Sequence, residues 1–253
     1  MTFSIIGHCP RTGAFGAAIA TSDLAVGNRC VRLAHGRGAM LSQHRTDSRL
    51  GDLGIAALQE GQSADDAVTH VISSSPDIEW RQLGALDHTG RSAVFHGRRM
   101  YSIYTHSTGK NCLALGNILD NEHVTDAMAN AFQQQPNQPL AERLLQALEA
   151  GLAAGGEVLG TLKSAALQVT GDHGIAAVDL RVDISDGRAV PDLRHLFDAY
   201  KGREAGLRAV ALEPDSVPVQ AKLFNASIQR IAQLGLETRF PTATHRDSWT
   251  VAD

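Results

Sequence analysis

Residues 1–23 read MTFSIIGHCPRTGAFGAAIATSD, and two runs within this stretch are typical of β-strands. Apolar residues over 2–9 and small apolar residues over 14–21 predict two neighbouring strands. Pro10 and Gly13 lie between them and fit a tight turn, because proline fixes its own φ and glycine accepts a left-handed backbone. The sequence therefore predicts a β-hairpin at the start of the chain, with a strand that begins at the second residue.

The elements predicted further along the chain come as runs of strands separated by pairs of helices. The first helical pair lies within residues 48–75, where Gly61 can end one helix and Ser63 with Asp66 forms a capping box for the next. The other expected strands cover 38–43, two runs within 82–97, 111–117, 163–169 and 175–183, and the other expected helices cover 121–134, 140–154, 192–200 and 218–234.

This order of elements predicts an α+β fold. Helices that arrive in pairs after runs of strands argue against alternating βαβ units and favour antiparallel sheets with helical layers outside them. The strands carry alanine and other small apolar residues on both faces, as expected for sheets that are covered on each side. We expect a four-layer αββα sandwich of two antiparallel sheets between helical layers.

Composition and charge exclude several classes of protein. The 253 residues carry a formal net charge of −4, which gives no general electrostatic surface for nucleic acid. No apolar run is long enough to span a bilayer, so no membrane partner is expected. The first residues lack the basic region and apolar core of a signal peptide, and we expect a cytoplasmic location.

No cofactor and no metal are predicted. None of the eleven histidines forms an H-x-x-x-H or H-E-x-x-H pair. A phosphate-binding P-loop, a dinucleotide-binding G-x-G-x-x-G in its proper context and a G-x-S-x-G nucleophile elbow are absent from the sequence. Cys9, Cys30 and Cys112 show no C-x-x-C spacing, and we interpret them as reduced packing residues.

Several segments of the sequence resemble those of a bacterial and archaeal family, domain of unknown function 1028 (DUF1028). They occur in the family's order over residues 2 to about 200, and they are TFSII, GAAIATSDLAVGN, LGDLGIAALQEGQSADDAV, LGNILDNEHVTDAMANAF, LAERLLQALEAGLAAGG, SAALQV and VDLRVD. The resemblance implies the fold of the N-terminal nucleophile (Ntn) hydrolases. It assigns residues 1–200 to this domain and leaves 201–253 as a helical or irregular extension, which packs on the domain or on a partner subunit.

The resemblance implies a chemical role for Thr2. In Ntn hydrolases the first residue of the mature chain attacks a carbonyl group, and its own free α-amine takes the proton. An α-amine suits this role because its pKa is near 8, roughly two units below that of a lysine amine. Thr2 would acquire such an amine if a methionine aminopeptidase removed Met1.

Other positions match the supporting residues of an Ntn site only by their place in the chain. Ser22 or Asp23 ends the second strand, where polar support is expected, and the alternative is a Ser-Asp turn. Arg32 stands where a basic residue is expected, but it can equally be a surface charge. Gln43 ends the strand over 38–43 and His44 follows it, and both are candidate oxyanion or substrate-binding groups. The alternative for His44 is a purely structural role.

Asn117 completes the candidate set. It follows Gly116 at the end of a buried strand, and its amide can donate a hydrogen bond to an oxyanion. The competing interpretation is that Asn117 organises the turn into the following helix.

Two functions remain open from the sequence. The first is an Ntn amidohydrolase that acts on a small amide-type metabolite, with Thr2 as nucleophile and Ser22, Gln43, His44 and Asn117 around the substrate. The second is a non-catalytic binding or oligomeric protein that keeps the fold and retains Met1, because a fold does not determine function. A homodimer is expected for either, since it is the commonest oligomer.

Overall fold

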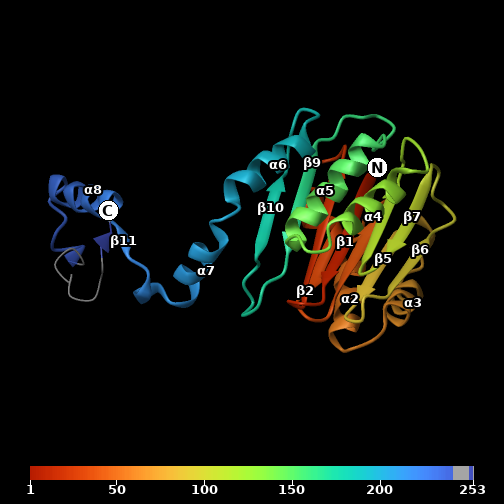
Figure 1. Cartoon of the computed structure of the whole chain (residues 1–253), viewed down its shortest axis with the longest axis horizontal. Helices are drawn as coiled ribbons and strands as arrows, with labels where there is room; N and C mark the ends of the chain where they lie inside the picture. The colour runs from red at the N-terminus through yellow and green to blue at the C-terminus, as the bar shows by residue number, and fades with distance from the viewer. Residues whose placement is uncertain (242–250, 253) are drawn as a thin grey trace. The chain divides into compact units, whose positions relative to one another are not determined.

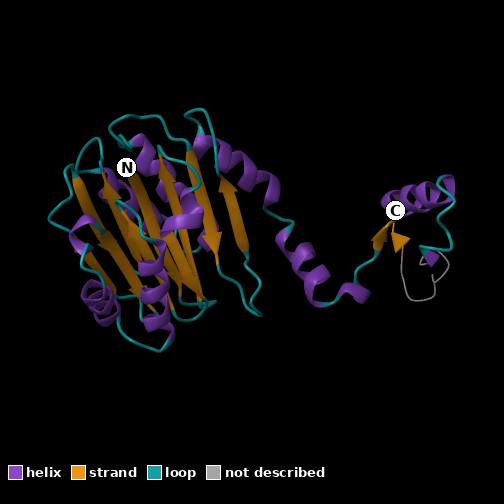
Figure 2. Cartoon of the chain, turned by 180° about the vertical axis from the view of Figure 1, so that it is seen from behind, coloured by secondary structure: helices purple, strands orange, loops and turns teal. Residues whose placement is uncertain are grey.

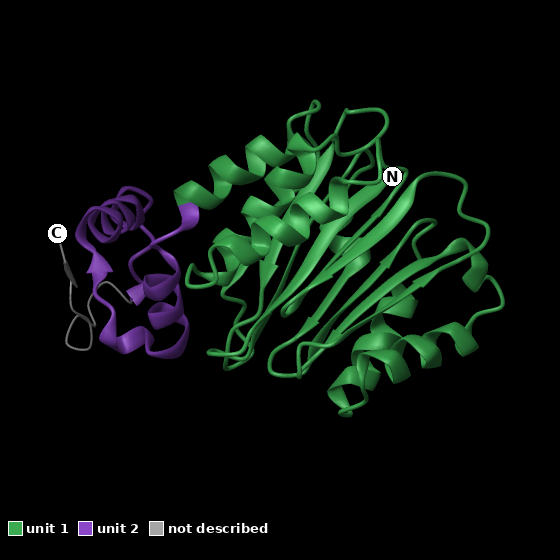
Figure 3. Cartoon of the chain, turned by 45° about the vertical axis from the view of Figure 1, so that its right-hand side comes forward, with its two compact units in different colours: residues 1–199 green, residues 200–253 purple. Residues whose placement is uncertain are grey.

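The structure is a computed structural model, and it describes residues 1–241 and 251–252. The chain divides into two compact units, Met1–Ala199 and Tyr200–Asp253, which are coloured separately in Figure 3. The first unit contains two antiparallel β-sheets with helices against them. The second unit is mainly helical.

The larger sheet of the first unit has six strands, in the order β10-β9-β2-β1-β8-β7 (Figure 1). The smaller sheet has four, in the order β3-β4-β5-β6. Every neighbouring pair in both sheets is antiparallel. The strands are β1 (Thr2–Cys9), β2 (Ala14–Thr21), β3 (Val31–Ala34), β4 (Gly38–Gln43), β5 (Gln82–Asp87), β6 (Ser92–His96), β7 (Tyr104–Gly109), β8 (Cys112–Asn117), β9 (Ser164–Val169) and β10 (Val178–Val182).

Two pairs of helices form the outer layers. Helices α4 (Val124–Gln134) and α5 (Leu140–Ala153) lie on the larger sheet, and α2 (Ser48–Gln59) and α3 (Ala64–Ser74) lie on the smaller one, as Figure 3 shows. Close approach of α5 requires a glycine in β2, because a Cβ on Gly16 would meet Leu144 at 2.6 Å. The predicted α+β sandwich of two antiparallel sheets between helical layers is confirmed.

The core between the two sheets is built from alternate residues of facing strands. Ile6 and Ile19 of the larger sheet and Leu41 and Leu86 of the smaller sheet belong to one buried cluster. Since side chains on a strand alternate between its two faces, residues two or four positions from these also point between the sheets. This alternation identifies the strand-end side chains that form the candidate site.

The structure adds elements that the sequence pattern does not indicate and moves the ends of others. Helix α1 (Val26–Cys30), strand β3 and strand β7 are present although the sequence pattern does not indicate them, so the strand over 38–43 is the fourth and not the third. Strand β7 has the sequence YTHSTG and shows no hydrophobic pattern, because it lies at the edge of the sheet and is partly exposed. The helix expected from residue 121 begins at Val124, and the strand expected from 175 begins at Val178.

Helix α6 (Ala189–Tyr200) ends at the boundary between the two units. The second unit, seen from behind in Figure 2, contains α7 (Glu204–Leu212), α8 (Ala221–Gln233) and a two-residue parallel pair of β11 (Val219–Gln220) with β12 (Val251–Ala252). Helix α8 covers the helix expected near 218–234. Packing of the extension against the domain or a partner stays a prediction. Trp249, a residue of the extension that could make such a contact, lies outside the described residues. None of the described helices has the length and apolar character needed to cross a bilayer.

The capping box of α3 gives a testable prediction. The Ser63 hydroxyl accepts a hydrogen bond from the Asp66 backbone N–H at 3.2 Å and donates to the Asp66 carboxylate at 2.6 Å. We expect Ser63→Ala to lower the free energy of unfolding by about 1 kcal/mol, because a helix N-terminal N–H loses its acceptor. Urea denaturation measures this. Ser73→Ala in the last turn of the same helix is the control, and an equal loss in both variants would show that the cap does not stabilise the helix.

Candidate functional site

Six polar side chains replace the apolar core at one end of the space between the sheets. We call them the end layer, and each is at most 6% exposed. They occupy the first or last residue of their strands, at positions that continue the alternation of the inter-sheet core. The end layer consists of Thr2, Thr21, Gln43, Gln82, Asn117 and Ser164.

Thr2 occupies the centre of this layer because β1 lies between β2 and β8 in the sheet. Its hydroxyl Oγ1 lies 3.5 Å from Oγ1 of Thr21. Both hydroxyls donate to the carbonyl oxygen of Met1. The Ser22 hydroxyl also reaches Met1, at 3.4 Å from its sulfur atom. Met1 therefore lies directly against the polar groups that surround Thr2.

A buried carboxylate stands beside the chain terminus. Glu157 is 2% exposed, and both of its carboxylate oxygens accept from the backbone N–H of Ser22, at 3.2 and 3.1 Å. Burial raises the pKa of Glu157 to about 7, against the opposing effects of Ser22 and the nearby α-ammonium. Burial likewise lowers the pKa of the Met1 α-amine, and the charge of Glu157 opposes that change.

The amide side chains of the end layer are joined across the two sheets. Asn117 Nδ2 donates to Gln82 Oε1 at 2.8 Å, and Gln82 Nε2 donates to the Gly116 carbonyl oxygen at 2.8 Å. Gln43 Nε2 donates to Ser4 Oγ at 3.0 Å. Among the described residues, Gln43 Oε1 and Asn117 Oδ1 are buried without a hydrogen-bond partner. The layer therefore offers two acceptor oxygens that the protein does not use itself.

His44 adds a third unused acceptor. Its Nδ1 lies 2.7 Å from the Trp80 carbonyl oxygen, which only accepts, so Nδ1 carries the proton. Burial lowers the pKa of His44, and the neutral ring then has an acceptor at Nε2, which has no hydrogen-bond partner among the described residues. His44 has a left-handed backbone with φ 52°, as does Arg45 with φ 41°. Such strain is common where function requires a particular side-chain direction.

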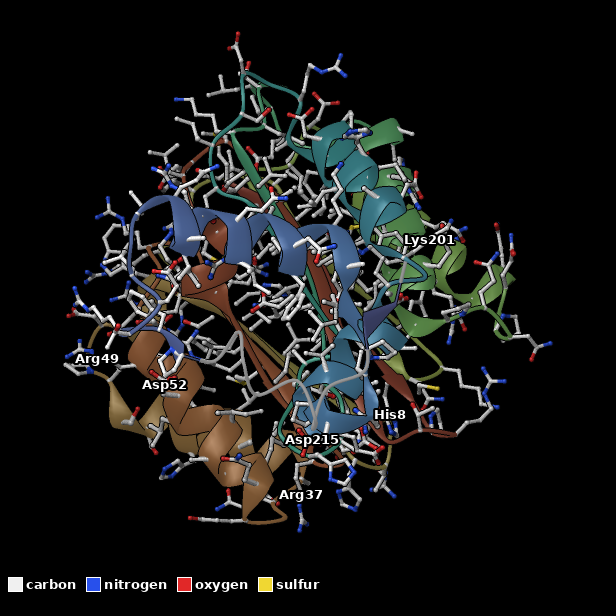
Figure 4. The ribbon with its side chains drawn as sticks, turned by 90° about the vertical axis from the view of Figure 1, so that its left-hand side faces the viewer. His8, Arg37, Arg49, Asp52, Lys201 and Asp215 are labelled. Atoms are coloured by element: carbon white, nitrogen blue, oxygen red, sulfur yellow. The ribbon has the colours of Figure 1, made fainter. Side chains whose placement is uncertain are left out.

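Arg32 and His8 lie away from the end layer. Arg32 pairs with Asp52 of α2, on the side of the smaller sheet that the helices cover. Figure 4 labels Asp52 beside Arg49 on the outer surface, and it labels His8 on β1. His8 lies near the end of β1 opposite Thr2. The interpretation of Arg32 as a charge outside the site agrees with this placement.

The structure brings together Thr2, Gln43 and Asn117 in the end layer. Ser22 and His44 directly follow the end-layer residues Thr21 and Gln43 in the chain. Sequence reasoning missed Thr21, Gln82, Ser164 and Glu157. Thr21, Gln82 and Ser164 carry a usable signal, because each is a polar residue at a strand end and in register with the inward-facing core positions. Glu157 carries none, since it follows α5 in a loop and is not on a sheet strand.

No metal site accompanies this arrangement. Within residues 1–241 and 251–252, no group of three histidine, cysteine, aspartate or glutamate side chains is placed to hold an ion. The end layer and Glu157 beside it provide hydroxyl groups, amides and one buried carboxyl group near the Met1 α-amine. Such a set suits nucleophilic attack on a carbonyl group.

A family model described as a family of unknown function, DUF1028, matches residues 2–193. The chain belongs to the DUF1028 family. The match covers the whole first unit up to α6 and includes every residue of the end layer as well as Glu157. The extension after α6 lies beyond the DUF1028 match.

A solved DUF1028 structure has the same fold. The crystal structure of a DUF1028 protein from Silicibacter pomeroyi is 34% identical to this chain and superposes with a TM-score of 0.74. The alignment covers 81% of this chain and 88% of that chain. No curated protein matches the sequence. These similarities establish the family and its fold, while DUF1028 membership specifies no reaction.

Proposed function

We propose that this protein is an Ntn amidohydrolase for a small amide-type metabolite, with Thr2 as its nucleophile after removal of Met1. The supporting observation is the position of Thr2 at the first residue of the central strand, inside a buried layer of hydroxyl and amide groups. Only the first residue of a chain can carry a side-chain hydroxyl and a free α-amine on the same Cα–Cβ unit. Removal of Met1 would supply that amine and uncover the Thr2 hydroxyl.

The reaction would proceed by an acyl-enzyme. The α-amine of Thr2 takes the proton of Oγ1 as this oxygen bonds to the amide carbon, and the carbonyl electron pair moves to its oxygen. The ammonium then protonates the leaving nitrogen as the C–N bond breaks. Water hydrolyses the resulting ester by the reverse sequence of proton transfers.

The remaining groups of the layer have assignable roles in this reaction. The Thr21 hydroxyl, 3.5 Å from Thr2 Oγ1, is placed to stabilise negative charge that forms beside the nucleophile. The unpartnered acceptors of Gln43, Asn117 and His44 suit a substrate that carries N–H groups, because a buried acceptor without a partner is costly. Ser22 holds Glu157 through its backbone N–H and contacts the position that Met1 occupies.

Intact-mass spectrometry tests the first requirement. We expect the protein, expressed without a tag at its N-terminus, to lack one methionine and to begin at Thr2. Quantitative retention of Met1 would remove the proposed base and would favour the non-catalytic alternative, a binding or oligomeric protein. Screening a library of small amides against the processed protein then identifies the substrate class, with release of the amine product as the readout.

A further inference from the structure

Glu157 reaches the chain terminus from the far side of the larger sheet. The segment after α5 turns through Gly155 and Gly156, whose φ values of 124° and 60° favour glycine. Its backbone then pairs with the residues that follow β8: the Asp120 N–H donates to the Gly156 carbonyl oxygen, and Glu157 forms a β-bridge with Leu119. These contacts fix the buried carboxylate beside the end layer.

The carboxylate of Glu157 accepts from neutral donors, and one positive charge of the main chain acts on it electrostatically. Both of its oxygens accept from the Ser22 N–H, and the Thr21 hydroxyl also interacts with it. The positive charge is the α-ammonium of Met1. A carboxyl group this deeply buried is either protonated or stabilised by a nearby positive charge, because burial of an unpaired ion is costly.

Other ionisable groups near the amine do not replace Glu157. Asp23 has a side chain that is 74% exposed and pairs with Arg29 at 3.3 Å. Burial raises the pKa of the Cys30 thiol and keeps it neutral. Burial also lowers the pKa of His44, which stays uncharged near neutral pH. Glu157 is therefore the buried carboxyl group among the ionisable groups that act on the terminus.

We infer that Glu157 is a positioning residue that binds the α-amine of Thr2 after Met1 is removed and stabilises the ammonium formed during nucleophilic attack. The inference rests on the proposed function. Consecutive residues lie about 3.8 Å apart, so the new amine forms within that distance of the present one and stays near the carboxylate. The proton moves from Thr2 Oγ1 to the α-nitrogen, and Glu157 remains a carboxylate throughout this step.

The test compares the basicity of the Thr2 amine in two full-length processed proteins. Wild type and Glu157→Gln are co-expressed with a methionine aminopeptidase, and intact mass confirms that each begins at Thr2. The rate of carbamylation of this amine by cyanate is then measured against pH by mass spectrometry of the N-terminal peptide. We expect Glu157→Gln to lower the amine pKa by about 1 unit or more, because an opposite charge at this range favours the protonated form.

Two further variants make the result specific. Glu157→Asp keeps the charge, and it should restore most of the amine pKa. Glu122→Gln removes a carboxylate from an exposed position before α4 and should leave the amine pKa unchanged. If Glu157→Gln does not fold, Glu157→Asp is compared with wild type: its shorter side chain draws the carboxylate back, so an amine pKa somewhat below that of wild type supports the pairing, and an unchanged amine pKa overturns it.

The outcomes separate this inference from the proposed function. An amine pKa that is equal in wild type and Glu157→Gln overturns the role of Glu157, even if Thr2 proves to be the nucleophile. A lowered pKa without any Thr2-dependent hydrolysis supports the pairing and rejects the enzyme. Where an amide substrate is found, the acidic limb of the pH–rate profile should move to lower pH in Glu157→Gln by the same amount as the amine pKa.

Discussion

Replacement of Thr2 by alanine is expected to abolish amide hydrolysis while the fold persists. The substitution removes the oxygen that we propose as the nucleophile, so we expect kcat/KM to fall by about 1,000-fold or more. The Thr2 hydroxyl is at the end of β1, where its backbone remains paired with Asn117. Thermal unfolding of the variant should therefore stay close to that of wild type.

Two variants serve as controls for Thr2→Ala. Thr2→Ser keeps a hydroxyl group and an α-amine, and it should retain measurable turnover. Thr12→Ala makes the same substitution in the exposed turn at the other end of the β1–β2 hairpin, and it should retain full turnover. Intact mass must show removal of Met1 from each protein. Undiminished activity in processed Thr2→Ala would exclude Thr2 as the nucleophile.

Ionisation of Glu157 is expected to destabilise the protein as the pH rises. Burial raises the pKa of this carboxyl from 4.5 to about 7, so the folded state binds a proton that the unfolded state has already lost. Stability from this group is fully present below about pH 4.5 and is lost as the pH rises through about 7. A difference of this size corresponds to about 3 kcal/mol, since each pKa unit is worth about 1.4 kcal/mol.

Urea denaturation between pH 4.5 and 7 measures this dependence. In Glu157→Gln the amide keeps an acceptor for the Ser22 N–H and cannot ionise, so its free energy of unfolding should not show the loss. The α-amine, whose pKa burial lowers from 8.0, acts in the opposite sense nearer pH 8, and the measurement therefore stops at pH 7. Identical pH profiles for wild type and Glu157→Gln would contradict a raised pKa. Glu122→Gln should follow wild type.

The fold could be predicted in outline because its signals are local. The alternation of apolar residues in β1 and β2, the turn residues between them and the capping box of α3 each depend on neighbours within a few positions. The structure confirms the strand bounds Thr2–Cys9 and Ala14–Thr21 without change. Strand β7 could not be predicted in this way, because an edge strand with an exposed face carries polar residues.

The candidate site was predictable only in part. Thr2, Gln43 and Asn117 stand out because each is a polar residue at the end of a predicted strand, and the resemblance to DUF1028 implies the nucleophile role that we propose for Thr2. Glu157 could not be found, because nothing local distinguishes it from a surface carboxylate. Its contact with Ser22 joins residues 135 positions apart in the chain.

By itself, the sequence determined the class of fold, the first strand at Thr2 and the presence of polar residues at several strand ends. Only the tertiary structure decided that these ends meet in one buried layer and that Glu157 is the carboxylate beside the terminus. The physical reason is the range of the interactions. Backbone conformation and strand alternation are set by adjacent residues, whereas burial and the pKa of a carboxyl group depend on which distant segments exclude water from it.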